Sequence, residues 1–437
     1  MESRDRCGFE AAASNPYRSK RKATESRYDM EDRKGVRVVE GSVGRILLLS
    51  MRRIHDLVAF CLAYEFEDVV AEVTGADRIE PEREATLELF RRVYKLTRYA
   101  TRSTRLAHLL TPPPPHVRLE RDYELFFPVF NHPHELFALA SIQGWRERCQ
   151  KAACFVSEAW PHLLPRYLIE LLRPFDHVFL GVHGCVEKVA ELIERPCSYL
   201  PLAVDVLRFS PHPGQPPERV IDVCNIGRRS VIAHDALLAL ARGRRIFYYY
   251  DTVAASGTNR LQRTFRVDDP AAHRLLLANL LRRSRFFIAN RARVNEAEFT
   301  YTREEISSRF YEGAAAGTVM LGEAPRTKEF QHQFDWPDAL LPIEFDSPYI
   351  ARVLEDLVND PDRMARISAA NSRNAALRHD WVHRLRTVFD NLGLRATAGM
   401  LSRDESLRML AAQAGQPYDK SQGGGASSGG LLRKSGG

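Results

Sequence analysis

Short apolar runs alternate with longer helical patterns along most of the chain, and this rhythm constrains the fold more than any other feature. The first clear run is Arg45–Ser50 (RILLLS), in which the apolar residues are continuous. Continuous runs of this length are typical of strands buried on both faces of a parallel sheet. Later runs occur at Tyr123–Phe130, Ala152–Val156, His177–Leu180, Cys197–Leu200, Arg219–Asn225, Arg245–Tyr250, Phe286–Ala289, Thr318–Leu321 and Leu341–Phe345.

Helical patterns fill most of the intervals between these runs, for example residues 56–107, Glu135–Gln150 and 231–242. Strands that alternate with helices form parallel βαβ units with right-handed crossovers. The 437 residues leave room for two domains, at roughly 150 residues each. Between the two sets of runs, Leu200–Pro217 is rich in proline and glycine, which indicates a linker. We therefore expect an α/β protein with two Rossmann-like domains.

The basic residues of the chain are mainly arginines. Nine of the 63 basic residues are lysines, which leaves 54 arginines, and the net charge is +7. Arginine binds phosphate through a rigid planar fork, so arginine-rich loops suit a nucleotide diphosphate. We find no basic helix and no aromatic RNA-binding motif, and therefore expect no nucleic-acid partner.

The cysteines and the hydropathy pattern indicate a cytoplasmic protein. The seven cysteines are scattered and form no close C-x-x-C pair, so neither a disulfide framework nor a structural zinc site is expected. No run approaches the roughly 18–20 apolar residues that cross a bilayer. The N-terminus lacks the apolar region of a secretory signal. We expect at most a peripheral association with membranes.

The stretch Glu304–Glu323 (EEISSRFYEGAAAGTVMLGE) carries the most functional information. Its serines favour a helix N-terminus, its alanines favour the helix interior, and Gly317 suits the left-handed position after the helix. Carboxylates such as Glu304 and Glu312 accept hydrogen bonds from sugar hydroxyls, and a helix N-terminus binds phosphate. An ordinary crossover helix whose glutamates face water explains the same pattern equally well.

Polar residues also follow several predicted strands, where ligands of parallel sheets collect. Ile226–Ser230 contains Gly227, Arg228 and Arg229 directly after a strand, which suits a diphosphate cradle or, equally, a solvated turn. In the first domain the same rule selects a group of polar residues at strand ends: Asn131, Ser157, Glu158 and His183.

The block R-F-Y-E-G-A-A-A-G before a buried strand resembles the signature of GT-B glycosyltransferases, most closely the CgeB-like proteins of the group 1 family. A Leu-Pro-x-x-x-Asp block at Leu200–Asp205, ahead of the linker, also resembles that family. The loop after the first strand departs from it, because Met51–His55 contains no glycine.

The resemblance implies a nucleotide-sugar donor and no separate cofactor. It implies that the diphosphate meets Arg228 or Arg229 and the N–H groups near Ser307 and Ser308. Glu312 is expected to bind the ribose and Glu304 the donor sugar. The other residues expected in the donor site are Gly227, Arg309 and Gly313.

The implied reaction is glycosyl transfer to the hydroxyl of a glycan, lipid or protein acceptor, in cell-surface glycan or polysaccharide synthesis. An inverting mechanism needs a base in the first domain, for which Glu158 and His183 are the candidates, whereas a retaining mechanism needs none. For each of the two, a structural role is also open. We expect no metal, because the Asp-x-Asp match Asp360-Pro-Asp362 lies between two predicted helices and not at a strand end.

Two other functional classes remain open. A catalytically silent binding or assembly protein can share the fold, and the loss of the glycine-rich first loop favours it. A nucleotide-sugar epimerase or a phosphorylase can also use the GT-B architecture. A phosphorylase that uses pyridoxal phosphate needs a Schiff-base lysine, and none of the nine lysines lies at a strand-end motif.

The pattern and the resemblance together give the expected division of the chain. Its parts are a disordered tail (1–40), an acceptor domain (41–205), a linker (206–218), a nucleotide-sugar domain (219–375), C-terminal helices that cross back to the first domain (376–412) and a flexible tail (413–437).

Overall fold

The computed structural model describes residues 44–414, apart from 82–83, 104–105, 108–109, 112–115, 161–163, 212–215, 253–265, 297–299 and 301–302. The predicted tail 1–40 therefore lies outside the described residues, as does 415–437.

The first sheet is parallel and has seven strands in the order β2-β1-β4-β7-β8-β9, with β5 paired to β7. Its strands are β1 (Gly44–Leu49), β2 (Asp77–Ile79), β4 (Tyr123–Phe126), β5 (Val129–Phe130), β7 (Cys149–Val156), β8 (His177–Leu180) and β9 (Cys197–Tyr199). A separate pair consists of β3 (Val117–Arg118) and β6 (Ile142–Gln143).

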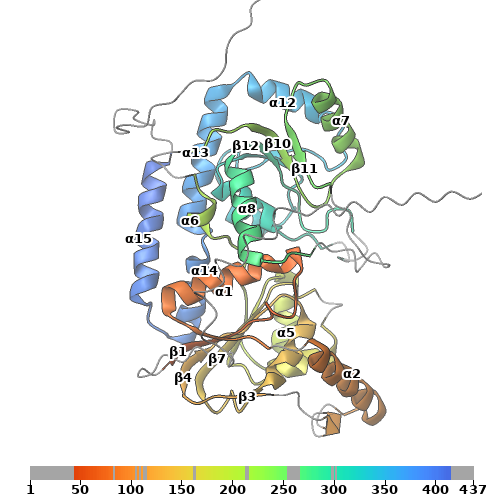
Figure 1. Cartoon of the computed structure of the whole chain (residues 1–437), viewed down its shortest axis with the longest axis vertical. Coiled ribbons are helices and arrows are strands. Elements are labelled where there is room, and N and C mark those ends of the chain that lie inside the picture. The colour runs from red at the N-terminus through yellow and green to blue at the C-terminus, as the bar shows by residue number, and fades with distance from the viewer. Residues whose placement is uncertain are drawn as a thin grey trace, which may run out of the picture. The chain divides into compact units, whose positions relative to one another are not determined.

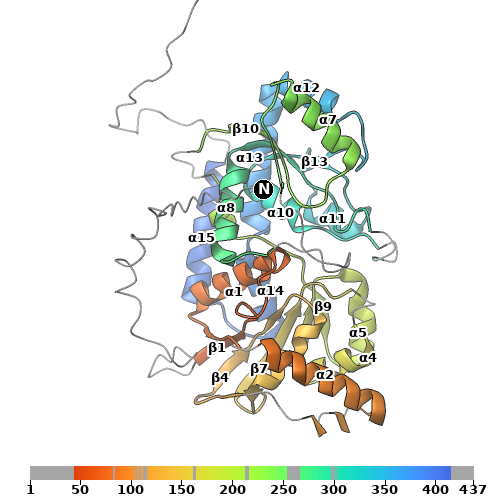
Figure 2. The ribbon, with the colours of Figure 1, turned by 45° about the vertical axis from the view of Figure 1, so that its right-hand side comes forward.

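Helices cover both faces of this sheet, because successive strand residues point to opposite sides. Leu48 faces α1 (Cys61–Thr74), whereas Leu49 belongs to the core on the other face. Figure 2 shows several of the helices of that second face together. The helices of the second face are α2 (Glu84–Thr101), η3 (Pro133–Ser141), α4 (Arg166–Ile169) and α5 (Val186–Ile193).

The second sheet is also parallel, with five strands in the order β11-β10-β12-β13-β14. Its strands are β10 (Ile221–Asn225), β11 (Tyr248–Tyr250), β12 (Ser284–Ile288), β13 (Val319–Gly322) and β14 (Leu341–Pro342). One face packs on α7 (Val231–Arg242) and α12 (Ile350–Val358), the other on α8 (Pro270–Arg282) and α10 (Ser308–Ala315). The prediction of an α/β protein with two Rossmann-like domains is confirmed.

The last helices pack on α1 of the first domain. The ring of Trp381, at the start of α14 (Trp381–Leu392), stacks on Phe66 with 4.4 Å between centroids. At the start of α15 (Ala398–Gln413), the Thr397 hydroxyl donates to the carbonyl of Val73 at 2.5 Å. Figure 1 shows α15 beside α13 (Pro361–Arg378) and reaching α1. The apolar core on this side is continuous from α1 to α8 and α10.

The predicted helix Glu135–Gln150 was wrong. A 3-10 helix occupies Pro133–Ser141, and Glu135 folds back onto the backbone N–H groups that precede this helix. β6 and the left-handed Gly144 (φ +65°) follow, so the chain turns before β7 begins. The helix does not continue to Gln150, because the left-handed backbone of Gly144 breaks the helical path.

Two other differences have local causes. Gly75 ends α1 at φ +66°, and the next residues form β2, a strand with too few apolar residues to stand out in the sequence. The expected strand Tyr123–Phe130 is divided into β4 and β5 at Phe127-Pro128, since proline has no N–H for the ladder. In the segment predicted as linker, Val206–Phe209 forms the short helix α6, capped by Asp205.

Among the described residues, no helix combines the length and the apolar character needed to cross a membrane.

Candidate functional site

The carboxyl edge of the second sheet has a topological switch point between β10 and β12, because the chain passes from β10 outward to β11 and then returns to the far side of β10. Ligands of open parallel sheets bind at such points. The loop 226–230 after β10 and the loop 289–293 after β12 flank it, and both contain arginines. The candidate donor site is built on these loops and on the start of α10.

Gly227 and Arg309 lie against each other. Gly227 has φ +84°, and its N–H donates to Asp251 at 2.5 Å. A Cβ on Gly227 would lie 2.6 Å from Nη2 of Arg309, so a side chain here would displace the guanidinium. The structure therefore brings together two predicted donor-site residues that are far apart in the sequence.

Arg228 belongs to a chain of ion pairs that reaches the first domain. Its Nη2 lies 2.9 Å from Glu296, which also pairs with Arg293 at 2.8 Å. Arg293 in turn contacts the predicted catalytic Glu158 at 3.2 Å. Burial alone would raise the pKa of Glu296, but Arg228 and Arg293 hold it below its usual value. Glu158 and Arg228 are thus connected through two residues that the sequence analysis did not select.

Arg229 is partly held by its own neighbours. Its Nη1 lies 3.9 Å from Asp251, and its guanidinium stacks 5.4 Å from the centre of the Tyr250 ring. Both partners lie at the end of β11 or directly after it. Arg229 is therefore oriented at the edge of the second sheet, where a phosphate would need it.

The start of α10 matches its predicted form. Ser307 is the N-cap residue, and its hydroxyl donates to the carbonyl of Asn290, in the loop after β12, at 2.6 Å. Ser308 is the first helical residue. The carboxylate of Glu304 lies just before the helix and accepts from the backbone N–H of Arg326 at 2.6 Å. The predicted left-handed position is confirmed at Gly317, with φ +62°.

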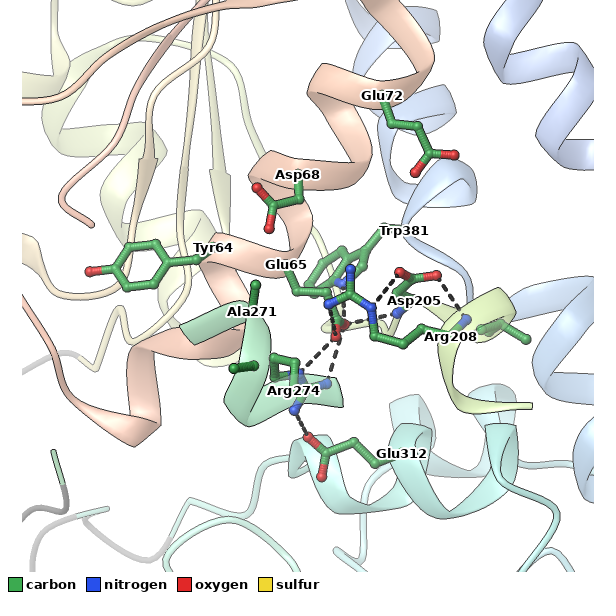
Figure 3. Close-up of polar contacts among 12 residues, drawn as sticks. Tyr64, Glu65, Asp68, Glu72, Asp205, Arg208, Ala271, Arg274, Glu312 and Trp381 are labelled. Carbon is green, nitrogen blue, oxygen red and sulfur yellow. Dashed lines mark hydrogen bonds and ion pairs between the residues drawn. The ribbon is translucent and has the colours of Figure 1, made fainter. Parts of the chain in front are cut away.

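Glu312 is held inside the protein. It is 1% exposed, its Oε1 accepts from Nη1 of Arg274 at 2.5 Å, and its Oε2 lies 3.4 Å from Nη1 of Arg309. Figure 3 shows Arg274 between Glu312 and Glu65 of α1, which accepts from Nε of Arg274 at 2.7 Å. Burial would raise the pKa of Glu312, but the two arginines hold it below its usual value. Of its two oxygens, Oε2 has the weaker partner.

Gly313 has a packing role. A Cβ at this position would meet Sδ of Met320 at 2.6 Å and Cδ1 of Phe287 at 2.8 Å. The absence of a side chain lets α10 lie directly on β12 and β13. This packing explains why position 313 is a glycine, and its place in the donor site stays a prediction.

The three predicted catalytic residues have separate partners. Glu158 accepts from Nε1 of Trp160 at 2.8 Å, and Glu304 is held by the backbone of Arg326. His183 lies after β8, is about half exposed, and its Nε2 is 3.3 Å from Oε1 of Glu329 on α11 (Lys328–Gln333). No hydrogen bond or ion pair between described residues joins any two of these three side chains.

Arg274 is the main residue of the site that sequence reasoning missed. It lies on the same face of α8 as Leu277, Ala278 and Leu281, and all four are buried. An arginine in register with an apolar helix face is the signal that could have revealed it, because a buried arginine requires a carboxylate partner.

The first sheet has its own switch point, between β1 and β4, and a cavity of about 230 Å³ lies beside it. Residues after β1, among them His55, and residues of η3, among them Glu135, line this cavity. Glu135 is 4% exposed and its Oε2 accepts from the N–H of Asn131 at 2.6 Å. Sequence reasoning missed this cavity because its polar residues come from separate segments of the chain: His55, Arg91, His132, His134 and Glu135.

Stability is expected to fall as the pH rises from about 5 to 8. Burial raises the pKa of Glu135 and of Glu67 from 4.5 to about 8, although the N–H groups of Asn131 and His132 lower the first and Arg52 lowers the second. The folded protein thus keeps protons that the unfolded chain has lost, and the slope is up to about 1.36 kcal/mol per pH unit for each group. Urea unfolding at several pH values measures this slope.

The variant Glu135→Gln should remove its share of the slope and leave that of Glu67. The titratable residues near Glu135 include His55, His132 and Glu67. Nε2 of His55 lies 3.6 Å from Oε1 of Glu135. An identical slope in the variant would show that Glu135 titrates normally in the folded protein.

The second half of the chain matches a known protein family. Residues 258–390, which extend from α8 to α14, match the sequence model of a family described as glycosyl transferase-like. This segment of the chain is therefore glycosyl transferase-like. A search of curated proteins found no relative.

Several solved structures are similar to the chain at low identity. An α,α-trehalose-phosphate synthase (UDP-forming) from Burkholderia vietnamiensis is 12% identical, with 80% of this chain and 99% of that chain covered and a TM-score of 0.43. The complex of S. aureus MnaA with UDP is 11% identical, with 80% and 98% covered and a TM-score of 0.40. The catalytic domain of starch synthase IV from Arabidopsis thaliana, bound to ADP and acarbose, is 9% identical, with 76% and 82% covered and a TM-score of 0.39.

Proposed function

We propose that the protein is a glycosyltransferase that transfers a sugar from a nucleotide-sugar donor to an acceptor hydroxyl. The observation that carries this proposal is the contact of Gly227 with Arg309 at the start of α10, at the switch point of the second sheet. The glycosyl transferase-like match includes α10 and so supports it. Membership of the CgeB-like group and a role in cell-surface glycan synthesis rest on the resemblance of the R-F-Y-E-G-A-A-A-G block.

The proposed donor position follows from the charges. The diphosphate lies over the loop 226–230 and the N-terminus of α10, where Arg228, Arg229 and the helix N–H groups offset its charge. Arg309 turns from Glu312 toward the diphosphate, which frees Oε2 of Glu312 to accept a ribose hydroxyl. Oε1 stays with Arg274, so Glu312 remains paired throughout.

In the transfer step the acceptor oxygen bonds to the anomeric carbon, while the bond from this carbon to the diphosphate oxygen breaks. The diphosphate leaves with the electron pair, and its new charge is stabilised by the arginines. The proton of the acceptor hydroxyl passes to a base of the first domain in an inverting reaction, with Glu158 and His183 as the predicted candidates. Trp160 and Arg293 both contact Oε2 of Glu158, which leaves Oε1 to accept the proton.

Nucleotide binding is expected to stabilise the protein, and Arg309→Met to remove the effect. A UDP-, GDP- or dTDP-sugar at about 100 times its dissociation constant should add about 2.7 kcal/mol to the free energy of unfolding. We choose Arg309 for substitution because Glu312 keeps its hydrogen bond from Arg274 in this variant, so the fold should be retained. Thermal unfolding with and without each ligand measures the stabilisation.

Arg285→Met is the matched control, because Arg285 is about half exposed on β12 and pairs with Asp222, away from the switch point. It should respond to the nucleotide as the wild type does. If none of the nucleotide-sugars stabilises the wild type, the proposed donor site is wrong.

Transfer is expected to continue in excess EDTA. Arginines and helix N–H groups can replace a divalent cation at the leaving diphosphate. The Asp360-Pro-Asp362 motif supplies no such cation site in our proposal, since Asp360 caps α13 by accepting from the N–H of Arg363 at 2.9 Å. Loss of activity in EDTA, restored by Mg²⁺ or Mn²⁺, would contradict metal-independent transfer.

A catalytically silent binding protein is the second candidate, and one observation favours it. The loop after β1, where a glycine-rich segment would admit the donor, holds Arg52, which donates to the carbonyl of Tyr64 at 2.9 Å and to Asp68 at 2.7 Å. Nucleotide-sugar binding without turnover, across alcohol, glycan and lipid acceptors, would identify this case.

We also propose a cytoplasmic location. Support comes from the cysteines, since the six that the structure describes are all free.

A further inference from the structure

The cavity of the first domain is apolar on most of its wall. It lies where ligands of a parallel sheet collect, between the loop after β1 and η3. A cavity of about 150 Å³ holds a benzene ring, so a cavity of about 230 Å³ has room for one ring with substituents. The apolar lining consists of Met51, Ile54, Leu57, Phe60, Phe137 and Ala138.

One buried carboxylate oxygen faces this apolar wall. Oε2 of Glu135 accepts from the N–H groups of Asn131 and His132, at 2.6 and 3.4 Å. Oε1 is buried, and among the described residues none gives it a hydrogen bond of good geometry. Its nearest charged neighbour is His55, whose Nε2 is 3.6 Å away, and the Asn131 amide also lies near the carboxylate. A buried polar atom without a partner is costly unless a ligand supplies one.

The cavity also borders residues that connect to the proposed donor site. His132, which lines it, is close enough to Glu158 and Arg293 for both to affect its pKa. Leu57, another lining residue, forms an antiparallel bridge with Arg266 of the second half of the chain. The N–H of Val267 next to it donates to the carbonyl of Asp56 at 2.7 Å. A molecule in the cavity therefore lies beside the ion pairs that lead to Arg228.

We propose that this cavity binds the acceptor, and that the acceptor is an alcohol with a small apolar ring whose hydroxyl hydrogen-bonds to Oε1 of Glu135. The proposal rests on the proposed glycosyl transfer and names the class of its second substrate. The six apolar side chains suit a ring, and five polar residues also line the cavity: His55, Arg91, His132, His134 and Glu135. The ring packs on the apolar wall, and the hydroxyl fills the space between Glu135 and His55. For an acceptor bound in this way, Glu135 takes the place of Glu158 or His183 as the base that receives the hydroxyl proton.

Benzyl alcohol and benzyl methyl ether test the proposal, because they share the ring but only the alcohol can donate a hydrogen bond. Burial raises the pKa of Glu135 to about 8, so at about pH 9 the carboxylate is ionised and can only accept. The histidines at the cavity are then neutral. Titration calorimetry on the full chain should give an alcohol affinity about 10-fold above that of the ether, about the effect of one hydrogen bond.

Three variants and a measurement at a second pH show whether the preference for the alcohol comes from Glu135. Glu135→Gln should reduce the preference to about twofold, whereas Glu124→Gln on β4, partly exposed beside Arg45, should keep it. Ala138→Leu fills the cavity and should abolish binding of both compounds. For the wild type near pH 6, the protonated carboxyl can donate to either compound, so the preference should shrink.

Equal affinity for the alcohol and the ether at high pH, or binding that survives Ala138→Leu, would overturn the proposal. Stabilisation by nucleotide-sugars is measured separately, so a failed donor site is distinguished from a failed cavity. If benzyl alcohol binds as expected but the protein never glucosylates or otherwise glycosylates it with a bound donor, the acceptor assignment falls.

Discussion

Arg274→Met is expected to lower the free energy of unfolding by about 3–5 kcal/mol, because it leaves two buried carboxylates without their counter-charge. Arg274 is 4% exposed and pairs with Glu65 through Nε at 2.7 Å and with Glu312 through Nη1. These carboxylates belong to α1 and α10, which lie on different sheets. Urea unfolding, followed by far-UV circular dichroism, measures the loss.

A second substitution distinguishes the effect of the lost charge from the effect of the lost packing. Adding Glu65→Gln to Arg274→Met should recover part of the stability, because the amide can still accept from the N–H of Asp205 and from Nε1 of Trp381. Arg285→Met removes a half-exposed ion pair and should cost less than about 1 kcal/mol. Equal losses of unfolding free energy in Arg274→Met and Arg285→Met would show that the buried ion pairs stabilise the fold no more than a half-exposed one.

Trp381→Ala is the second substitution with a large expected effect, about 3–5 kcal/mol. The ring is fully buried and stacks on Phe66, and its N–H donates to Glu65 at 3.1 Å. The substitution thus opens a cavity between α14 and α1 and also removes a partner of a buried carboxylate. Thermal and urea unfolding measure the effect.

Trp381→Phe is the matched variant, because it keeps the stack and loses the hydrogen bond. It should cost about 1–3 kcal/mol, the penalty of one unsatisfied buried group. Leu401→Ala on α15, where the side chain is more than half exposed, should change little. Loss of the same size in the alanine and phenylalanine variants would assign the whole effect to the hydrogen bond.

The fold was predictable where local pattern and tertiary structure agree. The helix 231–242 and the strand His177–Leu180 have the predicted bounds, because continuous apolar strands and amphipathic helices carry their signal within a few residues. β2 was not predictable, since a three-residue strand gains its order from pairing with β1. η3 was missed although its start is a local capping box, in which Glu135 lies three residues after His132.

The candidate site was predictable in its loops but not in its pairings. Gly227, Ser307 and Arg309 follow from strand-end and helix-start rules. That Arg309 lies on Gly227, and that Glu312 faces Arg274, depends on how α8 and α10 pack together. No spacing in the chain encodes that packing, so the partner of the buried glutamate needed the structure.

The packing of α14 and α15 on α1 has a consequence for the order in which the chain folds during synthesis. Phe66 and Val73 belong to the first domain, yet Trp381 and Thr397, which cover them, are synthesised after every strand of both sheets. Domains usually complete themselves in order from the N-terminus as they leave the ribosome. Here the first domain emerges with an apolar helix face uncovered, and it becomes complete only after the strands of both sheets have been synthesised.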